Sequence, residues 1–193
     1  MPINYRNLDY DFLIFDLDGT LIDSCDSILS CIAETLRSIS RRPQVKIEES
    51  LVGPPLQTVF SKLLSVEDHK IIEVAVDKFK ELYDSTYFDC CKPFPNAAEY
   101  FSGPQMKRNY LVTNKRCIPT DKILRKFGWT TYFEKIYTSD VYTKEMPDKH
   151  AVILKILESY QLRKDRSVYI GDSAEDQKAA VLAGISFLNP VSA

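Results

Sequence analysis

The stretch Phe12-Leu13-Ile14-Phe15-Asp16-Leu17-Asp18-Gly19-Thr20-Leu21 decides the fold of this chain. Its first four residues are apolar and predict a buried strand. Because side chains alternate along a strand, Asp16 and Asp18 share one side of the chain at the strand's carboxyl end. Gly19 then permits a sharp turn that a residue with a Cβ would resist. Two carboxylates at one point repel each other unless a cation joins them, and carboxylate oxygens suit magnesium.

The composition is that of an ordinary globular protein. The chain has 193 residues, of which 45% are hydrophobic and 27% charged, and its formal net charge is −2. No basic excess indicates a nucleic-acid partner, and no apolar run approaches the roughly 18 residues that span a membrane. The five cysteines fit no zinc site or redox pair, and the N-terminus lacks a signal-peptide pattern. We therefore expect a cytoplasmic protein with reduced thiols and with no nucleic-acid or membrane partner.

Residues 22–91 predict helices throughout and no clear strand. Apolar residues recur at helical spacing in three stretches, which follow Ser24, Pro55 and Ser65. Pro93 and Pro95 mark the end of this block. Because the block follows the first predicted strand and precedes the second, we expect a helical insertion over 22–91. The core is then discontinuous and comprises residues 1–21 and 92–193.

Strands and helices alternate in the second part of the core. Strands are predicted at 110–113, 135–138, 167–170 and 185–188, and helical patterns lie between them. Alternation at this spacing predicts an α/β fold, a doubly wound, parallel, Rossmann-like sheet with the small helical domain inserted. In such a sheet, ligands bind beyond the carboxyl ends of the strands. The residues that follow each strand are therefore candidates for one site.

Polar residues lie at or beyond the ends of three of these strands. The hydroxyl of Thr113, with nearby amides, could hold a phosphate oxygen. Lys144 lies in the loop after the strand at 135–138. Asp172 follows the strand at 167–170, and Asp176 falls in the first turn of the next helix, where an acidic residue is favourable. Each residue also has a plain structural interpretation: Thr113 and Asp172 as caps, and Lys144 as a surface lysine.

Taken together, these motifs resemble the four motifs of the haloacid dehalogenase-like hydrolases in the right order. Asp16 to Leu21 resembles the first motif, D-x-D-G-T-L, and Leu111 to Asn114 resembles the second. Gly171 to Asp176 resembles the fourth, G-D-x-x-x-D. The helical block lies where the phosphoglycolate phosphatase-like subgroup carries a small cap. The third motif departs from the subgroup's K-P-x-P, because this chain reads Lys144-Glu145-Met146-Pro147, and Lys149 is the alternative lysine.

The resemblance implies a magnesium-dependent phosphatase that acts on a small phosphorylated metabolite. Asp16 would be the nucleophile, forming an aspartyl-phosphate, and Asp18 the general acid/base. Magnesium would be held by Asp16, the backbone carbonyl of Asp18, and Asp172. Asp176 would orient these ligands without contacting the ion itself. The phosphate would be bound by Thr113, Asn114 and Lys144.

Other functions on the same scaffold stay open at this point. A phosphomutase would retain the aspartyl-phosphate and return it, and a dehalogenase would cleave a carbon–halogen bond. Dehalogenases of the family usually lack the second aspartate, so Asp18 favours phosphoryl transfer. A non-catalytic binding relative would be expected to lose Asp16 or Asp18, and both are present. For the assembly, we expect a monomer or a weak dimer.

Overall fold

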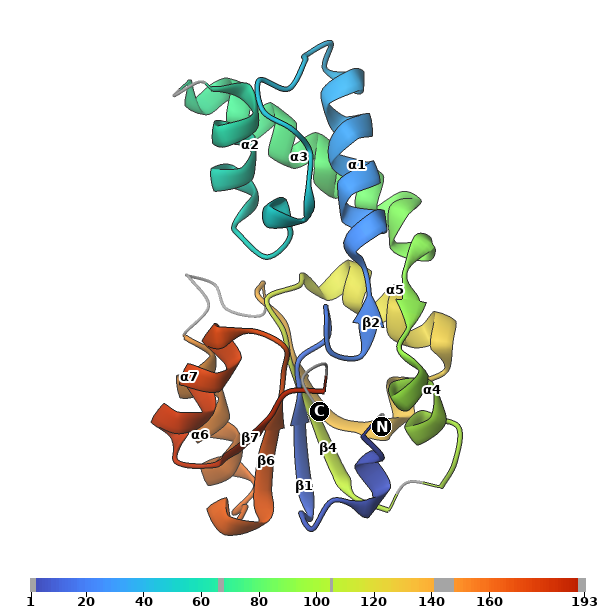
Figure 1. The fold of residues 1–193 in the computed structure, drawn as a ribbon, viewed down its shortest axis with the longest axis vertical. Coiled ribbons are helices and arrows are strands. Elements are labelled where there is room, and N and C mark those ends of the chain that lie inside the picture. Colours follow the sequence, from blue (N-terminus) through green and yellow to red (C-terminus); the bar gives the residue numbers. More distant parts are fainter. Residues whose placement is uncertain (1–2, 66–67, 105, 141–147, 191–193) are drawn as a thin grey trace. The chain divides into compact units, whose positions relative to one another are not determined.

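The computed structural model describes residues 3–65, 68–104, 106–140 and 148–190, which belong to two compact units (Figure 1). Unit 1 comprises Met1–Asp23 and Lys92–Ala193, and unit 2 comprises Ser24–Cys91. The sequence placed the first boundary two residues earlier, between residues 21 and 22. Each unit is described by itself below.

The centre of unit 1 is a five-stranded sheet in which every neighbouring pair of strands is parallel. Its strand order is β5-β4-β1-β6-β7. Because β1 is the middle strand, the residues that follow it lie between the ends of β4 and β6. The strands are β1 (Phe12–Phe15), β4 (Arg108–Val112), β5 (Phe133–Tyr137), β6 (Ser167–Ile170) and β7 (Ser186–Leu188).

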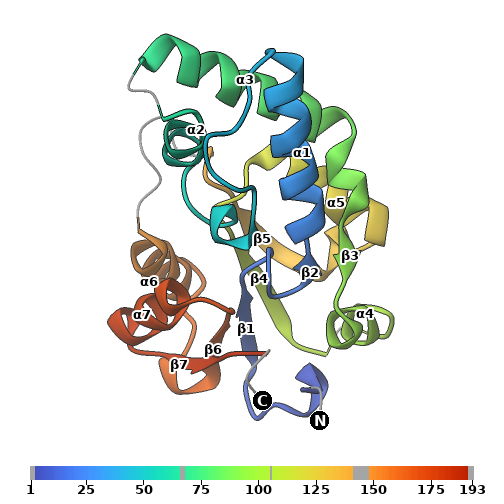
Figure 2. The ribbon, with the colours of Figure 1, turned by 45° about the horizontal axis from the view of Figure 1, so that its top comes forward.

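Helices cover both faces of this sheet, as the doubly wound prediction requires (Figures 1 and 2). On one face, α6 (Lys149–Ser159) and α7 (Ala174–Ala183) pack against β-strand residues such as Ile14, Tyr110 and Tyr169. On the other face, the ring of Phe15 contacts an aromatic cluster: Tyr5, Tyr100, Phe101 and Phe133. The elements of this second layer are α4 (Pro95–Phe101), α5 (Cys117–Phe127) and the 3-10 turns η1 (Tyr5–Asn7) and η4 (Thr130–Tyr132). A further 3-10 turn, η5 (Lys164–Arg166), directly precedes β6.

A short ribbon joins the two parts of unit 1. Strand β2 (Ile22–Asp23) pairs antiparallel with β3 (Lys92–Pro93), and the N–H of Phe94 donates to the carbonyl of Leu21 at 3.0 Å. The prediction that residues 22–91 contain no strand was therefore wrong at Ile22 and Asp23. Two residues carry too little hydrophobic pattern to indicate a strand, and the pairing partner lies about 70 residues away along the chain.

In the described part of unit 2, the regular elements are all helices. Helix α1 (Cys25–Ser38), helix α2 (Leu56–Leu64) and helix α3 (His69–Ser85) pack through one apolar cluster, and η2 (Glu49–Leu51) and η3 (Tyr87–Cys90) complete the unit. Phe60 and Phe79 meet edge to face within the cluster, and Phe79 stacks on Tyr83. The amphipathic pattern in the sequence arises because each helix turns its apolar stripe inward.

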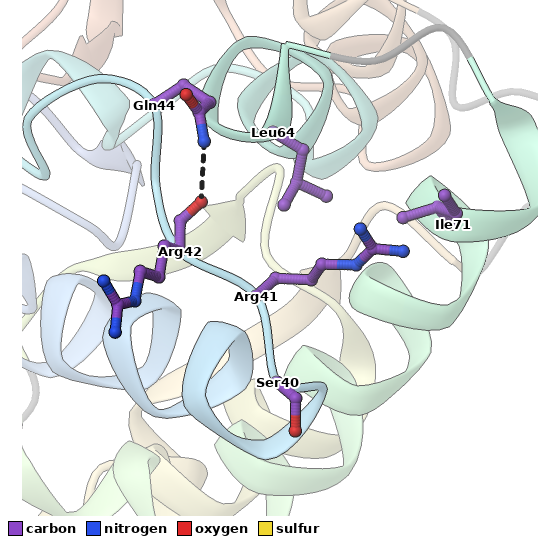
Figure 3. A pocket seen from close by; sticks show the side chains of 6 residues that line it. All are labelled: Ser40, Arg41, Arg42, Gln44, Leu64 and Ile71. Atoms are coloured by element: carbon purple, nitrogen blue, oxygen red, sulfur yellow. Dashed lines mark hydrogen bonds between the residues drawn. The ribbon is translucent and has the colours of Figure 1, made fainter.

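A pocket lies in unit 2 where α1 and α2 end (Figure 3). The side chain of Arg41 extends toward Ile71, while the Gln44 amide donates to the carbonyl of Arg42 at 3.5 Å. Cations near helix carboxyl ends offset the helix dipole, which explains the arginines without a ligand. None of the described residues that line the pocket is an acid, a histidine or a cysteine: they are Ser40, Arg41, Arg42, Gln44, Leu64 and Ile71.

Candidate active site

The loop after β1 carries the first two candidate residues. The N–H of Asp16 donates to the carbonyl of Ile170 at 2.9 Å, which continues the parallel pairing of β1 with β6 by one residue. The carbonyl of Leu17 then accepts hydrogen bonds from the N–H groups of Thr20 and Leu21, so the chain turns sharply. As a result, Asp16 is 5% exposed and lies at the carboxyl edge of the sheet.

Gly19 allows Asp172 to approach this loop. Gly19 has a φ of +79°, and a Cβ at this position would lie 2.2 Å from Oδ2 of Asp172. The hydroxyl of Thr20 donates to the other oxygen, Oδ1 of Asp172, at 3.2 Å. The carboxylate that follows β6 is therefore held against the loop that follows β1, as the predicted topology required.

Asp176 lies in the first turn of α7 and forms a capping box with Ser173. The hydroxyl of Ser173 accepts from the N–H of Asp176 at 3.1 Å, and Oδ2 of Asp176 accepts from the N–H of Ser173 at 3.2 Å. The other oxygen, Oδ1, accepts from the hydroxyl of Tyr169 at 3.0 Å and from the ammonium of Lys149 at 2.7 Å. Both oxygens of Asp176 are therefore already engaged in hydrogen bonds.

Lys149 joins Asp176 to Asp16. Its ammonium donates to Oδ1 of Asp16 at 2.9 Å, and its side chain is only 5% exposed. Lys144, which the sequence favoured as the phosphate-binding lysine, lies outside the described residues. The choice between the two lysines stays a prediction, but the contacts of Lys149 now favour Lys149.

The carboxylates Asp16, Asp172 and Asp176 form an acidic cluster. One oxygen from each lies within 4.8 Å of the other two, which is close enough to share a cation. Burial raises the pKa of Asp16 to about 7, although Lys149 opposes this shift, and burial also raises the pKa of Asp172. Burial acts in the same sense on Asp176, but the ammonium of Lys149 and the bonds from Ser173 outweigh it and hold its pKa below the usual value.

The loop after β4 brings a second lysine that the sequence analysis missed. Lys115 donates to both carboxylate oxygens of Asp18, at 2.8 and 3.0 Å, and its side chain is 7% exposed. Thr113 is buried, and its hydroxyl accepts from the N–H of Lys115 at 3.1 Å, so its own proton can be donated to a ligand. Asn114 is exposed, and its side chain makes no hydrogen bond to another described residue.

Sequence reasoning also missed three residues that hold the acids in place, namely Thr20, Tyr169 and Ser173. Tyr169 was expected as an apolar strand residue, and its ring is indeed buried in the core. A tyrosine in a fully buried strand needs a partner for its hydroxyl, and this was the available signal for its bond to Asp176. Ser173, three residues before Asp176, fits the spacing of a capping box.

Residues 13–189 match the family described as haloacid dehalogenase-like hydrolases. The chain belongs to this family. The match spans both units and includes the described acids Asp16, Asp18, Asp172 and Asp176.

Curated proteins that are similar to this chain include a nucleotidase and phosphatases. The chain is 27% identical over 186 residues to a 5′-nucleotidase from Pseudomonas aeruginosa, an alignment that covers 93% of this chain and 81% of the relative. It is 27% identical over 179 residues to a phosphoglycolate phosphatase from Agrobacterium fabrum, covering 89% of this chain and 76% of the relative. The family and the enzyme class predicted from the sequence, a phosphatase, are thereby confirmed.

The solved structures agree with the predicted fold. A haloacid dehalogenase-like family hydrolase from Streptococcus pneumoniae is 26% identical and superposes with a TM-score of 0.76, covering 94% of this chain and 84% of that structure. The α/β fold is therefore confirmed. Within the described parts of the chain, no helix has both the length and the apolar character needed to cross a bilayer.

Proposed function

We propose that this hydrolase is a magnesium-dependent phosphatase that cleaves a small phosphorylated metabolite through an aspartyl-phosphate on Asp16. The observation that carries the proposal is the position of Asp16, a buried carboxylate bonded to Lys149 and grouped with Asp172 and Asp176. The names of the relatives support the substrate class, because they describe a nucleotidase and phosphatases.

The charges of the described residues favour a divalent cation. Four carboxylates (Asp16, Asp18, Asp172, Asp176) face two ammonium groups (Lys115, Lys149), so with every acid ionised these residues carry four negative and two positive charges, a net −2. Oxygen ligands from carboxylates are those that magnesium prefers.

The pattern of hydrogen bonds indicates which acids would hold the cation. Because both oxygens of Asp176 are engaged, Asp16 and Asp172, with the backbone carbonyl of Asp18, are the better candidates for direct ligands. Asp176 would then support the site through Lys149. Magnesium bound there would act as a Lewis acid that offsets the negative charge of the phosphoryl oxygens.

The chain's own residues supply the nucleophile and the proton transfers. An oxygen of Asp16 attacks phosphorus as the bond to the leaving oxygen breaks, and Asp18 donates a proton to that oxygen. Water then attacks the aspartyl-phosphate, Asp18 takes its proton, and phosphate leaves with Asp16 restored. Lys149 and the hydroxyl of Thr113 would stabilise the phosphoryl oxygens, over which charge spreads in the transition state.

A phosphate-release assay on the purified protein tests this proposal. Wild-type protein should hydrolyse 4-nitrophenyl phosphate with magnesium and lose this activity in excess chelator. Asp16→Asn should form no acid-stable phosphoenzyme and should lose about 10³-fold or more in turnover, because an uncharged amide replaces the attacking carboxylate.

A matched control is Asp121→Asn, which makes the same change at a half-exposed acid paired with Arg125. It should retain wild-type turnover. Undiminished turnover in chelator would refute the metal dependence, and near-normal turnover of Asp16→Asn would refute the nucleophile. Halide release from a haloacid without phosphate release would favour the dehalogenase alternative.

A further inference from the structure

The four carboxylates of the site have different partners. Asp16, Asp172 and Asp176 form the acidic cluster, and each contributes an oxygen to it. Asp18 lies two residues from Asp16, yet both of its oxygens accept from the ammonium of Lys115, at 2.8 and 3.0 Å. Because a carboxylate with both oxygens on one ammonium cannot turn without breaking a hydrogen bond, this ion pair restrains the orientation of Asp18.

The backbone of Lys115 is itself anchored to two strand ends. Its N–H donates to the hydroxyl of Thr113, beyond β4, and its carbonyl accepts from the N–H of Ser139, beyond β5. The side chain is 7% exposed, whereas that of Asp18 is 26% exposed. Lys115 is thus the more buried and more firmly anchored residue of the pair, and its ammonium restrains the more exposed carboxylate of Asp18.

A free Asp18 carboxylate would have a competing partner. Carboxylates bind divalent cations readily, and an unrestrained Asp18 beside the acidic cluster would be drawn to the same cation. Once bound to a metal through its side chain, a carboxylate is a poorer proton carrier. The pair with Lys115 competes with such metal binding by engaging both oxygens, and one of its two hydrogen bonds opens when Asp18 takes up a proton.

We propose that Lys115 is a positioning residue that reserves Asp18 for proton transfer by holding its carboxylate away from the acidic cluster. This inference rests on the proposed function, because it assigns a task to the acid/base of that reaction. Lys115 acts through Asp18 and needs no contact with the substrate.

The dependence of Lys115→Met on the leaving group tests the proposal. An alkyl phosphate such as glycerol phosphate has a poor leaving group that needs the proton from Asp18, whereas 4-nitrophenolate leaves without one. Lys115→Met should therefore lower kcat on glycerol phosphate by about 10- to 100-fold, a partial loss of the roughly 10²- to 10⁴-fold that acid/base catalysis contributes. On 4-nitrophenyl phosphate it should lower kcat by less than about threefold.

The same change at Lys178, an exposed lysine of α7, is the matched control and should leave both rates unchanged. If Lys115→Met lowers both rates equally, Lys115 does not act through proton transfer and the inference is refuted. An inactive wild-type protein would instead refute the proposed function. If Lys115→Met does not fold, Lys115→Gln, which keeps a polar end group, takes its place.

A double-mutant cycle separates an effect through Asp18 from a direct one. In an Asp18→Asn background, Lys115→Met should cause no further loss on glycerol phosphate, because the group that it positions has already been changed. A full additional loss in this background would show that Lys115 acts independently of Asp18 and would overturn the inference.

Metal affinity gives a readout that does not depend on turnover. Manganese, titrated by electron paramagnetic resonance, should bind Lys115→Met several-fold more tightly than wild type, because Asp18 no longer has the Lys115 ammonium holding both of its oxygens away from the acidic cluster. This gain should vanish in the Asp18→Asn background. A gain of the same size in both backgrounds would reflect only the lost positive charge and would contradict the positioning role.

Discussion

At the scale of single residues, the site depends on a position that has no room for a side chain. A Cβ on Gly19 would lie 2.2 Å from Oδ2 of Asp172, and the φ of +79° is itself unfavourable for alanine. Gly128 has a similar φ of +73°, but nothing lies within 4 Å of the position that a Cβ would take there. Gly128→Ala therefore measures only the cost of placing an L-residue in this backbone conformation, which is about 1–2 kcal/mol.

We expect the positive φ to lower the free energy of unfolding by a similar amount in Gly19→Ala and Gly128→Ala, measured by urea unfolding. Only Gly19→Ala should also displace Asp172. Gly19→Ala should then lose about tenfold or more in turnover and in manganese affinity, and Gly128→Ala should retain both. Equal activities for the two variants would show that the close approach of Gly19 to Asp172 has no functional role.

The sequence predicted the acids better than the lysines. Asp16 and Asp172 each follow an apolar strand, so the strand pattern alone brings them to one edge of the sheet. Lys115 follows Thr113 by two residues, and its sequence position gives no sign that the side chain turns back toward β1. A lysine has a long, flexible side chain, and only the tertiary structure shows whether the ammonium reaches solvent or a buried acid.

At the scale of elements, α6 begins with a residue that is unfavourable for the helix. Lys149 is its first residue, and a cation there opposes the helix dipole. The bonds to Asp16, beyond β1, and to Asp176, on α7, offset this cost and link three elements. A lysine at this position is therefore best explained by its partners.

Lys149→Met should both destabilise the protein and inactivate it. Its removal leaves two buried carboxylates without their cation, which we expect to cost about 3 kcal/mol or more in urea unfolding. Turnover should fall about 10²-fold or more from lost charge stabilisation. Lys144→Met and the exposed Lys178→Met are the comparisons and should retain stability and most activity. A large loss of turnover at Lys144 with little at Lys149 would move the phosphate-binding role back to Lys144.

The elements themselves were predicted to different degrees. Strand β6 has the bounds that were read from the sequence, because Ser167–Ile170 is a short apolar run closed by a glycine. Helix α5 begins at Cys117, two residues before Pro119, a residue that favours the first turn of a helix. Here the N–H of Cys117 is satisfied by the side chain of Asp140, 23 residues further along, a contact that local sequence cannot reveal.

At the scale of the whole molecule, we predict that unit 2 can be removed at the β2–β3 ribbon. Asp23 pairs directly with Lys92, and paired strand residues lie about 5 Å apart, so a two-residue Asn-Gly hairpin can replace Ser24–Cys91. The site residues Asp16, Asp172 and Lys149 all belong to unit 1.

We expect the shortened chain to unfold cooperatively on heating and to bind manganese within about threefold of the full chain, measured by calorimetry. The same deletion with Asp172→Asn is the control and should lose most of this affinity. An unfolded product, or a folded one that does not bind manganese, would show that unit 1 does not form the site by itself.

The net charge of −2 that the described site residues carry when ionised also implies an order of events in time. A phosphate dianion that approaches the four acids before a cation is repelled, whereas one that arrives afterwards meets a site close to neutrality. Binding should therefore be ordered, with the cation first and phosphate second, and phosphate released before the cation. Because coupling between two ligands is reciprocal, inorganic phosphate should in turn tighten the hold of the protein on its cation by the same factor.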